Sequence, residues 1–154
     1  MRLTEQLQEQ WRAEQVPSVE GVVFANGSAV SIRSKVQVSS GAQRIILERD
    51  GLLELDEIVA SSDFFWIPVT PLVEHVWKEM GLIILAGEGS MGADGFVAVC
   101  DCISGDFVWV ALFFESNPFR AIAVIDGDIS ATSTLGDVWR FPLKSPEAVG
   151  ILIK

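Results

Sequence analysis

The sequence predicts an α+β fold in which an antiparallel β-meander sheet is covered by two helices, with a smaller N-terminal hairpin unit beside it. Short runs rich in Val, Ile, Phe and Trp, separated by turn residues, fill residues 82–143, which is typical of consecutive antiparallel strands. Residues 3–16 and 71–80 show the apolar spacing of amphipathic helices. Residues 29–38 alternate between apolar and polar side chains, which is the period of a strand with one solvent-facing side.

The first helix is expected at the N-terminus, where Leu3, Leu7 and Trp11 recur every four residues among Glu, Gln and Arg. Its end is expected near Val16-Pro17, because proline cannot continue a helix. The apolar stripe of this helix is narrow.

The second helix is expected over residues 71–80. Thr70 is a suitable N-cap, Pro71 fits the first helical position, and Gly81 fits a left-handed stop. His75 would then face solvent. The other face would be apolar and cover the sheet with Leu72, Val73, Val76, Trp77 and Met80.

Turn signals divide the remaining chain into strands. Asn26-Gly27 and Asp50-Gly51 are two-residue hairpin signals that flank the strand at residues 29–38, and they predict the small antiparallel unit at the front. Residues 96–103 and 107–114 are apolar at successive positions, so these strands should be central and covered on both faces. Further turns are expected at residues 104–106, 116–118 and 126–127, whereas residues 56–69 receive no assignment.

Length and charge restrict the class of protein. The chain has 154 residues, which predicts a single domain over residues 1–154. Its net charge is −10 and its pI is about 4.4, so phosphate backbones and anionic membranes would repel it. The N-terminal residues are mostly polar and no apolar run approaches the roughly 20 residues of a membrane span. We therefore expect a cytoplasmic protein without nucleic-acid or membrane partners.

Groups that commonly carry catalysis or bind metals are scarce. One His and two Cys cannot supply a zinc site or a histidine relay, and Cys100 and Cys102 are expected as buried free thiols about 7 Å apart on one strand face. The glycines of residues 87–92 match a dinucleotide-binding pattern, but a strand rather than a helix follows them. The loop from Gly87 to Gly95 is therefore expected to connect two strands. The alternative is a recognition loop, with a cation held by Glu88 and Asp94.

Two carboxylates and one tryptophan depart from their surroundings. Asp101 and Glu115 lie in otherwise apolar runs, which favours either a functional role or an ion pair with Arg120 or Arg140. Trp139 follows the turn at residues 135–137, and an exposed tryptophan beside acidic groups would be a suitable anchor for a basic protein partner.

Part of the chain resembles a known class of proteins. At residues 87–96, 113–119 (Phe-Phe-Glu-Ser-Asn-Pro-Phe) and 132–142 (Thr-Ser-Thr-Leu-Gly-Asp-Val-Trp-Arg-Phe-Pro), it is similar to the small acidic immunity proteins of bacterial polymorphic toxin systems, including the SUKH group. The similarity covers the last 75 residues at most. An early Trp…Leu-Pro signature is missing, so no site residue is transferred. The resemblance implies an α+β domain that binds and neutralises a toxin enzyme, often a basic nuclease.

The hypothesis from sequence is a non-enzymatic, acidic protein-binding domain without cofactors or metals, which occludes a basic partner. An alternative is a small-ligand-binding protein or carboxylate enzyme with a pocket near the loop of residues 87–95, lined by Trp109 and Glu115. A homodimer is a third hypothesis, because the central strands are apolar on both faces. The residues expected to bind a partner are Glu88, Asp94, Asp106, Glu115, Asp126, Asp128, Asp137 and Trp139.

Overall fold

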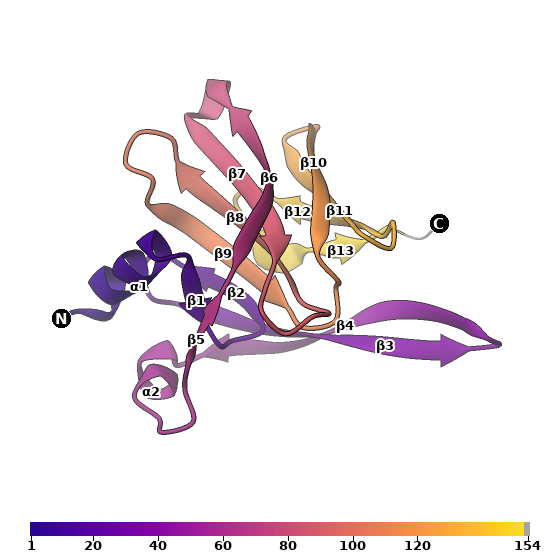
Figure 1. Ribbon diagram of the computed structural model, residues 1–154, viewed down its shortest axis with the longest axis horizontal. Helices are drawn as coiled ribbons and strands as arrows, with labels where there is room; N and C mark the ends of the chain where they lie inside the picture. Colours follow the sequence, from indigo (N-terminus) through magenta and orange to yellow (C-terminus); the bar gives the residue numbers. More distant parts are fainter. Residues whose placement is uncertain (153–154) are drawn as a thin grey trace.

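The computed structural model describes residues 1–152 and contains three layers (Figure 1). A seven-stranded antiparallel sheet is the middle layer. The second sheet has four antiparallel strands, β10 to β13, and packs on one face of the first; two helices and a two-stranded sheet, β1 with β5, cover the other face. The elements are α1 (Leu3–Arg12), β1 (Gln15–Pro17), β2 (Gly21–Phe24), β3 (Ala29–Ser39), β4 (Ala42–Leu53), α2 (Leu55–Val59), β5 (Trp66–Pro68), β6 (Thr70–Trp77), β7 (Leu82–Glu88), β8 (Gly95–Asp101), β9 (Phe107–Phe113), β10 (Phe119–Ile125), β11 (Asp128–Ser133), β12 (Val138–Pro142) and β13 (Gly150–Ile151), with short 3-10 turns η1 (Lys78–Met80) and η2 (Pro146–Ala148).

The chain is mostly antiparallel sheet with few helical residues, so the α+β class with a β-meander is confirmed. The order of the large sheet is β4-β3-β2-β9-β8-β7-β6. Because β2 pairs with β9, the N-terminal hairpin belongs to this sheet, and the expectation of a separate small unit was wrong. The meander expected over residues 82–143 divides after β9, since β10, β11 and β12 form the second sheet.

Two hydrophobic cores lie on opposite faces of β8 and β9. One core joins α1, α2 and the small sheet to residues such as Phe96 and Val110, and Trp11 of α1 contacts the ring of Phe96 edge-on. The other core joins the two large sheets through Trp109 and Phe113. The central position predicted for these two strands is therefore confirmed, although β8 ends at Asp101 and Ile103 is exposed in the turn.

The first predicted helix is present, but the second is not. Residues 70–77 form the edge strand β6, followed by the 3-10 turn η1. The side chains of Val73 and Trp77 pack toward the second sheet, whereas Leu72 and Val76 are about half exposed on the other face. The segment therefore forms a strand, with side chains on alternate faces, instead of the helix that the apolar spacing predicted, because β7 supplies a hydrogen-bonding partner along it. Gly81 does adopt the predicted left-handed conformation, but it ends η1.

The signal at Asp50-Gly51 produces a bulge instead of the expected hairpin turn. Ser31 pairs with Gly51 and Ile32 pairs with Arg49, so Asp50 is an extra residue within the continuous strand β4. Gly51 has a φ of 93°, which a bulge tolerates as well as a turn does. The β3–β4 turn lies instead at Ser40-Gly41, and the Asn26-Gly27 turn joins β2 to β3 as predicted.

The helical layer differs in part from the expectation. Leu7 and Trp11 of α1 are buried, as the spacing indicated. The second helix of this layer is α2, which buries Leu55 and extends into residues 56–69, the segment that received no assignment. Within residues 1–152, no helix has the length and hydropathy that crossing a lipid bilayer requires.

Candidate functional site

The carboxylates expected to form one acidic surface lie at two ends of the molecule. The β7–β8 loop, the β9–β10 connection and the β11–β12 turn meet at one end, where the N–H of Asn117 donates to Ala93 and that of Thr134 donates to Pro118. The β8–β9 and β10–β11 turns lie at the opposite ends of their strands. These eight residues therefore do not build a single surface: Glu88, Asp94, Glu115, Asp137 and Trp139 belong to the first end and its core, and Asp106, Asp126 and Asp128 to the second.

Two of the expected contact residues are inaccessible to a partner. Trp139 is 0% exposed and packs against Phe113, Phe119 and Phe141, so its proposed role as a surface anchor is wrong. Its position in β12 places it between the two sheets. Asp94 is also fully buried, where its Oδ1 accepts a hydrogen bond from the N–H of Met91 at 3.0 Å. Both side chains are part of the protein interior and cannot contact another protein.

The loop of residues 87–95 connects β7 to β8, as predicted. Gly87 lies in β7 and pairs with Phe96 of β8, and a Cβ at this position would lie 2.1 Å from the carbonyl oxygen of Thr70. The glycine is therefore required by the close approach of β6. Asp94 folds back against Gly89 inside the loop. Among the described residues, no group of three or more His, Cys, Asp or Glu side chains is placed to hold a metal ion.

Asp101 has a local structural role. Its Oδ1 accepts hydrogen bonds from the N–H groups of Ser104 and Ile103, each at 2.9 Å, and these bonds lower the pKa of the carboxyl group. Its partners are therefore main-chain groups of the β8–β9 turn rather than Arg120 or Arg140. Glu115 is exposed in the β9–β10 connection.

The two cysteines are free, but only one is buried. Burial raises the pKa of the Cys100 thiol to about 12, which keeps it protonated and unreactive. Cys102 is exposed because β8 ends before it, so the expectation that both thiols are buried was wrong for this residue.

His75 and the two residues named for the alternative pocket do not lie where the sequence suggested. His75 is half-buried on β6, beside Val73 and Trp77, instead of facing solvent from a helix. Trp109 is 2% exposed and donates its indole N–H to the carbonyl oxygen of Leu143 at 3.0 Å. Glu115 lies beyond the other end of β9, about 20 Å along the chain at 3.3 Å per residue, so the two do not line one pocket.

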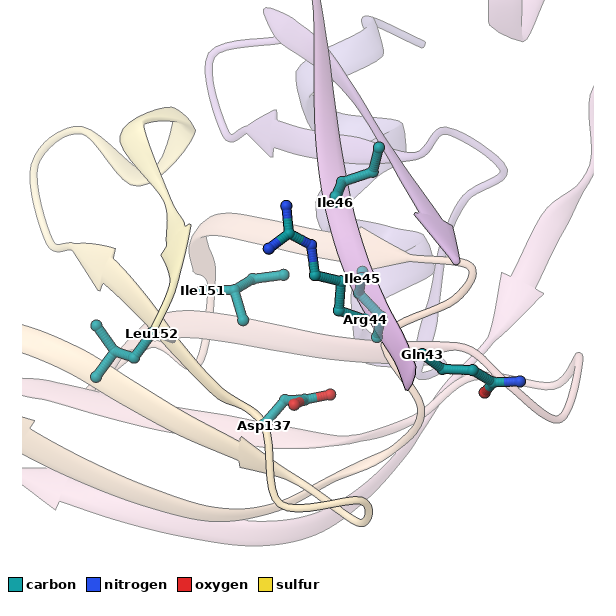
Figure 2. A pocket seen from close by; sticks show the side chains of 7 residues that line it. All are labelled: Gln43, Arg44, Ile45, Ile46, Asp137, Ile151 and Leu152. Carbon is teal, nitrogen blue, oxygen red and sulfur yellow. The ribbon is translucent and has the colours of Figure 1, made fainter. Parts of the chain in front are cut away.

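A groove lies between β4 and the C-terminal strand. It has a volume of about 380 Å³, and Figure 2 shows residues of β4 on one side and the residues after β11 on the other. A smaller recess of about 70 Å³ continues it toward Val36 and Leu135. The groove is lined by Gln43, Arg44, Ile45, Ile46, Asp137, Ile151 and Leu152.

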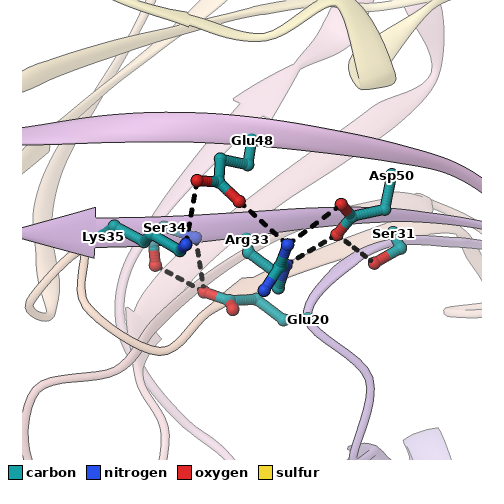
Figure 3. A network of polar contacts seen from close by, with 7 residues as sticks. All are labelled: Glu20, Ser31, Arg33, Ser34, Lys35, Glu48 and Asp50. Atoms are coloured by element: carbon teal, nitrogen blue, oxygen red, sulfur yellow. Dashed lines mark hydrogen bonds and ion pairs between the residues drawn. The ribbon is translucent and has the colours of Figure 1, made fainter.

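A polar network fixes β3 and β4 to the body beside this groove (Figure 3). Arg33 donates to Asp50 and Glu48, each at 2.8 Å, and this raises the pKa of Arg33 and lowers that of Asp50. Glu20 accepts hydrogen bonds from the N–H and hydroxyl of Ser34, and from the N–H of Phe114 at 2.8 Å. The Arg33 contacts join β3 to β4, and the Glu20 contacts join β3 to the end of β9, so the network holds these strands together.

The most distinctive exposed surface surrounds α2, and sequence reasoning missed it. We call residues 52–65 the acidic corner. Four exposed carboxylates and two exposed apolar side chains lie on it, with no Lys or Arg between them. The apolar residues are Leu52, which is 83% exposed, and Phe65, which is 53% exposed. The carboxylates are Glu54, Asp56, Glu57 and Asp63.

Core packing and main-chain hydrogen bonds hold the acidic corner on the body of the protein. Leu55 of α2 is buried in the core, and Ile58 packs against the same cluster. The carbonyl of Phe65 accepts a hydrogen bond from the N–H of Ser18 at 3.1 Å, and its own N–H donates to the Ser18 hydroxyl at 3.3 Å. The exposed side chains thus project from a fixed backbone, as binding residues on loops commonly do. The four acidic residues of this segment without a Lys or Arg were the available signal in the sequence.

Comparisons with protein-family models, with curated proteins and with solved structures find no significant match to this chain. The resemblance to immunity proteins therefore stays a prediction.

Proposed function

We propose that this protein is a non-enzymatic protein-binding domain whose acidic corner docks on a basic protein. The observation that carries the proposal is the exposed Phe65 in a segment, residues 52–65, that holds four exposed carboxylates, has a charge of −4 and contains no basic residue. The aromatic ring would supply buried apolar area, and the carboxylates would steer a cationic surface toward it. The immunity hypothesis fits this chemistry, because a toxin enzyme that binds nucleic acid presents a basic surface to occlude.

The carboxylates of the acidic corner lie outside the ion pairs of residues 1–152. The carboxylates of Glu5, Glu48, Asp50 and Asp106 are engaged by arginine or lysine. The four carboxylates of the acidic corner take part in none of these pairs and are therefore available to cations of a partner. Exposed charges of this kind contribute mainly to the association rate, while the central aromatic side chain determines how long a complex persists.

Titration against basic nuclease domains tests the proposal, with affinity measured over a salt series. We expect binding that weakens as salt rises, because exposed charges are screened. Phe65→Ala should weaken binding by about tenfold or more, and Asp56→Lys with Glu57→Lys should slow association.

The matched control is Asp126→Lys with Asp128→Lys, which makes the same charge change at the β10–β11 turn. These two residues belong to the surface that the sequence suggested. Equal losses from both charge reversals would show that only net charge matters and would contradict a specific acidic corner. If none of the basic domains bound the protein, the proposed protein-binding function would be contradicted.

A further inference from the structure

We draw no further inference here: the strongest candidate, the exposed apolar face of Val36 and Val38 on the arm that residues 34–47 form at the outer ends of β3 and β4 (Figure 1), carries none because nothing in the structure shows what covers it.

Discussion

The central strands β8 and β9 are apolar on both faces, whereas the arm of residues 34–47, the outer parts of β3 and β4, is apolar at alternate positions of β3, and the surroundings of the two regions differ as well. Every residue of β8 from Gly95 to Cys100 is buried, because helices cover one face and the second sheet covers the other. In the arm, the same kind of side chain at Val36 or Val38 is about half exposed or more. The difference shows that a strand's pattern determines which side chains share a face, whereas neighbouring elements determine whether that face is buried.

The largest expected effect comes from removing a large side chain between the two sheets. Trp109→Ala should lower the free energy of unfolding by about 3–5 kcal/mol, since it leaves a cavity and removes the hydrogen bond to Leu143. Val38→Ala in the arm should change it by less than about 0.5 kcal/mol, because that side chain is 64% exposed. Urea unfolding at low protein concentration measures both. Equal losses would mean that the arm is as tightly packed as the centre.

A smaller effect is expected where the arm joins the body. Glu20→Ala leaves the N–H groups of Ser34 and Phe114 without their acceptor and should cost about 1–3 kcal/mol. Arg33→Ala removes ion pairs that are more exposed to solvent, so its effect should be smaller. The comparison is made by urea unfolding, with Glu20→Gln as the control that keeps one acceptor oxygen. A larger loss from Arg33→Ala would identify the ion pairs as the main attachment of the arm.

The smallest effects concern two carboxyl groups with lowered pKa values, Asp50 at the root of the arm and Asp101 at the end of β8. The pKa of Asp50 is lowered by a hydrogen bond from Arg33, and that of Asp101 by main-chain N–H groups of Ser104 and Ile103. In both cases the folded pKa lies below the unfolded value. The stabilisation is therefore complete above the unfolded pKa and is lost as pH falls through the folded one.

The two carboxyl groups should respond differently to salt and to Arg33→Ala. High salt screens the exposed ion pair, so the pKa of Asp50 should rise toward its usual value while that of Asp101 changes little. Arg33→Ala should have the same selective effect. Carboxyl titration by NMR in low and high salt measures both shifts. A rise at Asp101 as large as that at Asp50 would contradict the assignment of its pKa to main-chain hydrogen bonds.

Sequence patterns that fit a single type of secondary structure were assigned correctly. The spacing of Leu3, Leu7 and Trp11 identified α1, and the apolar runs identified β8 and β9 as central. Patterns that fit two types of secondary structure were assigned wrongly. A Thr-Pro pair followed by apolar residues fits a helix start and also an edge strand, and Asp-Gly fits a bulge as well as a turn.

The candidate surfaces depended on contacts between distant segments. The exposure of Phe65 and the burial of Trp139 could not be assigned from residue type, since both are aromatic residues near carboxylates. Trp139 is buried because β12 lies between the two sheets. Phe65 is exposed because its backbone bonds to Ser18 at the margin of the core.

The sequence by itself determined the α+β class, the acidic charge and the positions of most turns, because those properties follow from composition and from contacts within a few residues. Only the tertiary structure decided that β10 to β13 form a second sheet, that β3 and β4 extend as an arm, and which acidic residues share a surface. Those outcomes arise from pairings such as β2 with β9, which join residues about ninety positions apart and leave no periodic signal in the chain.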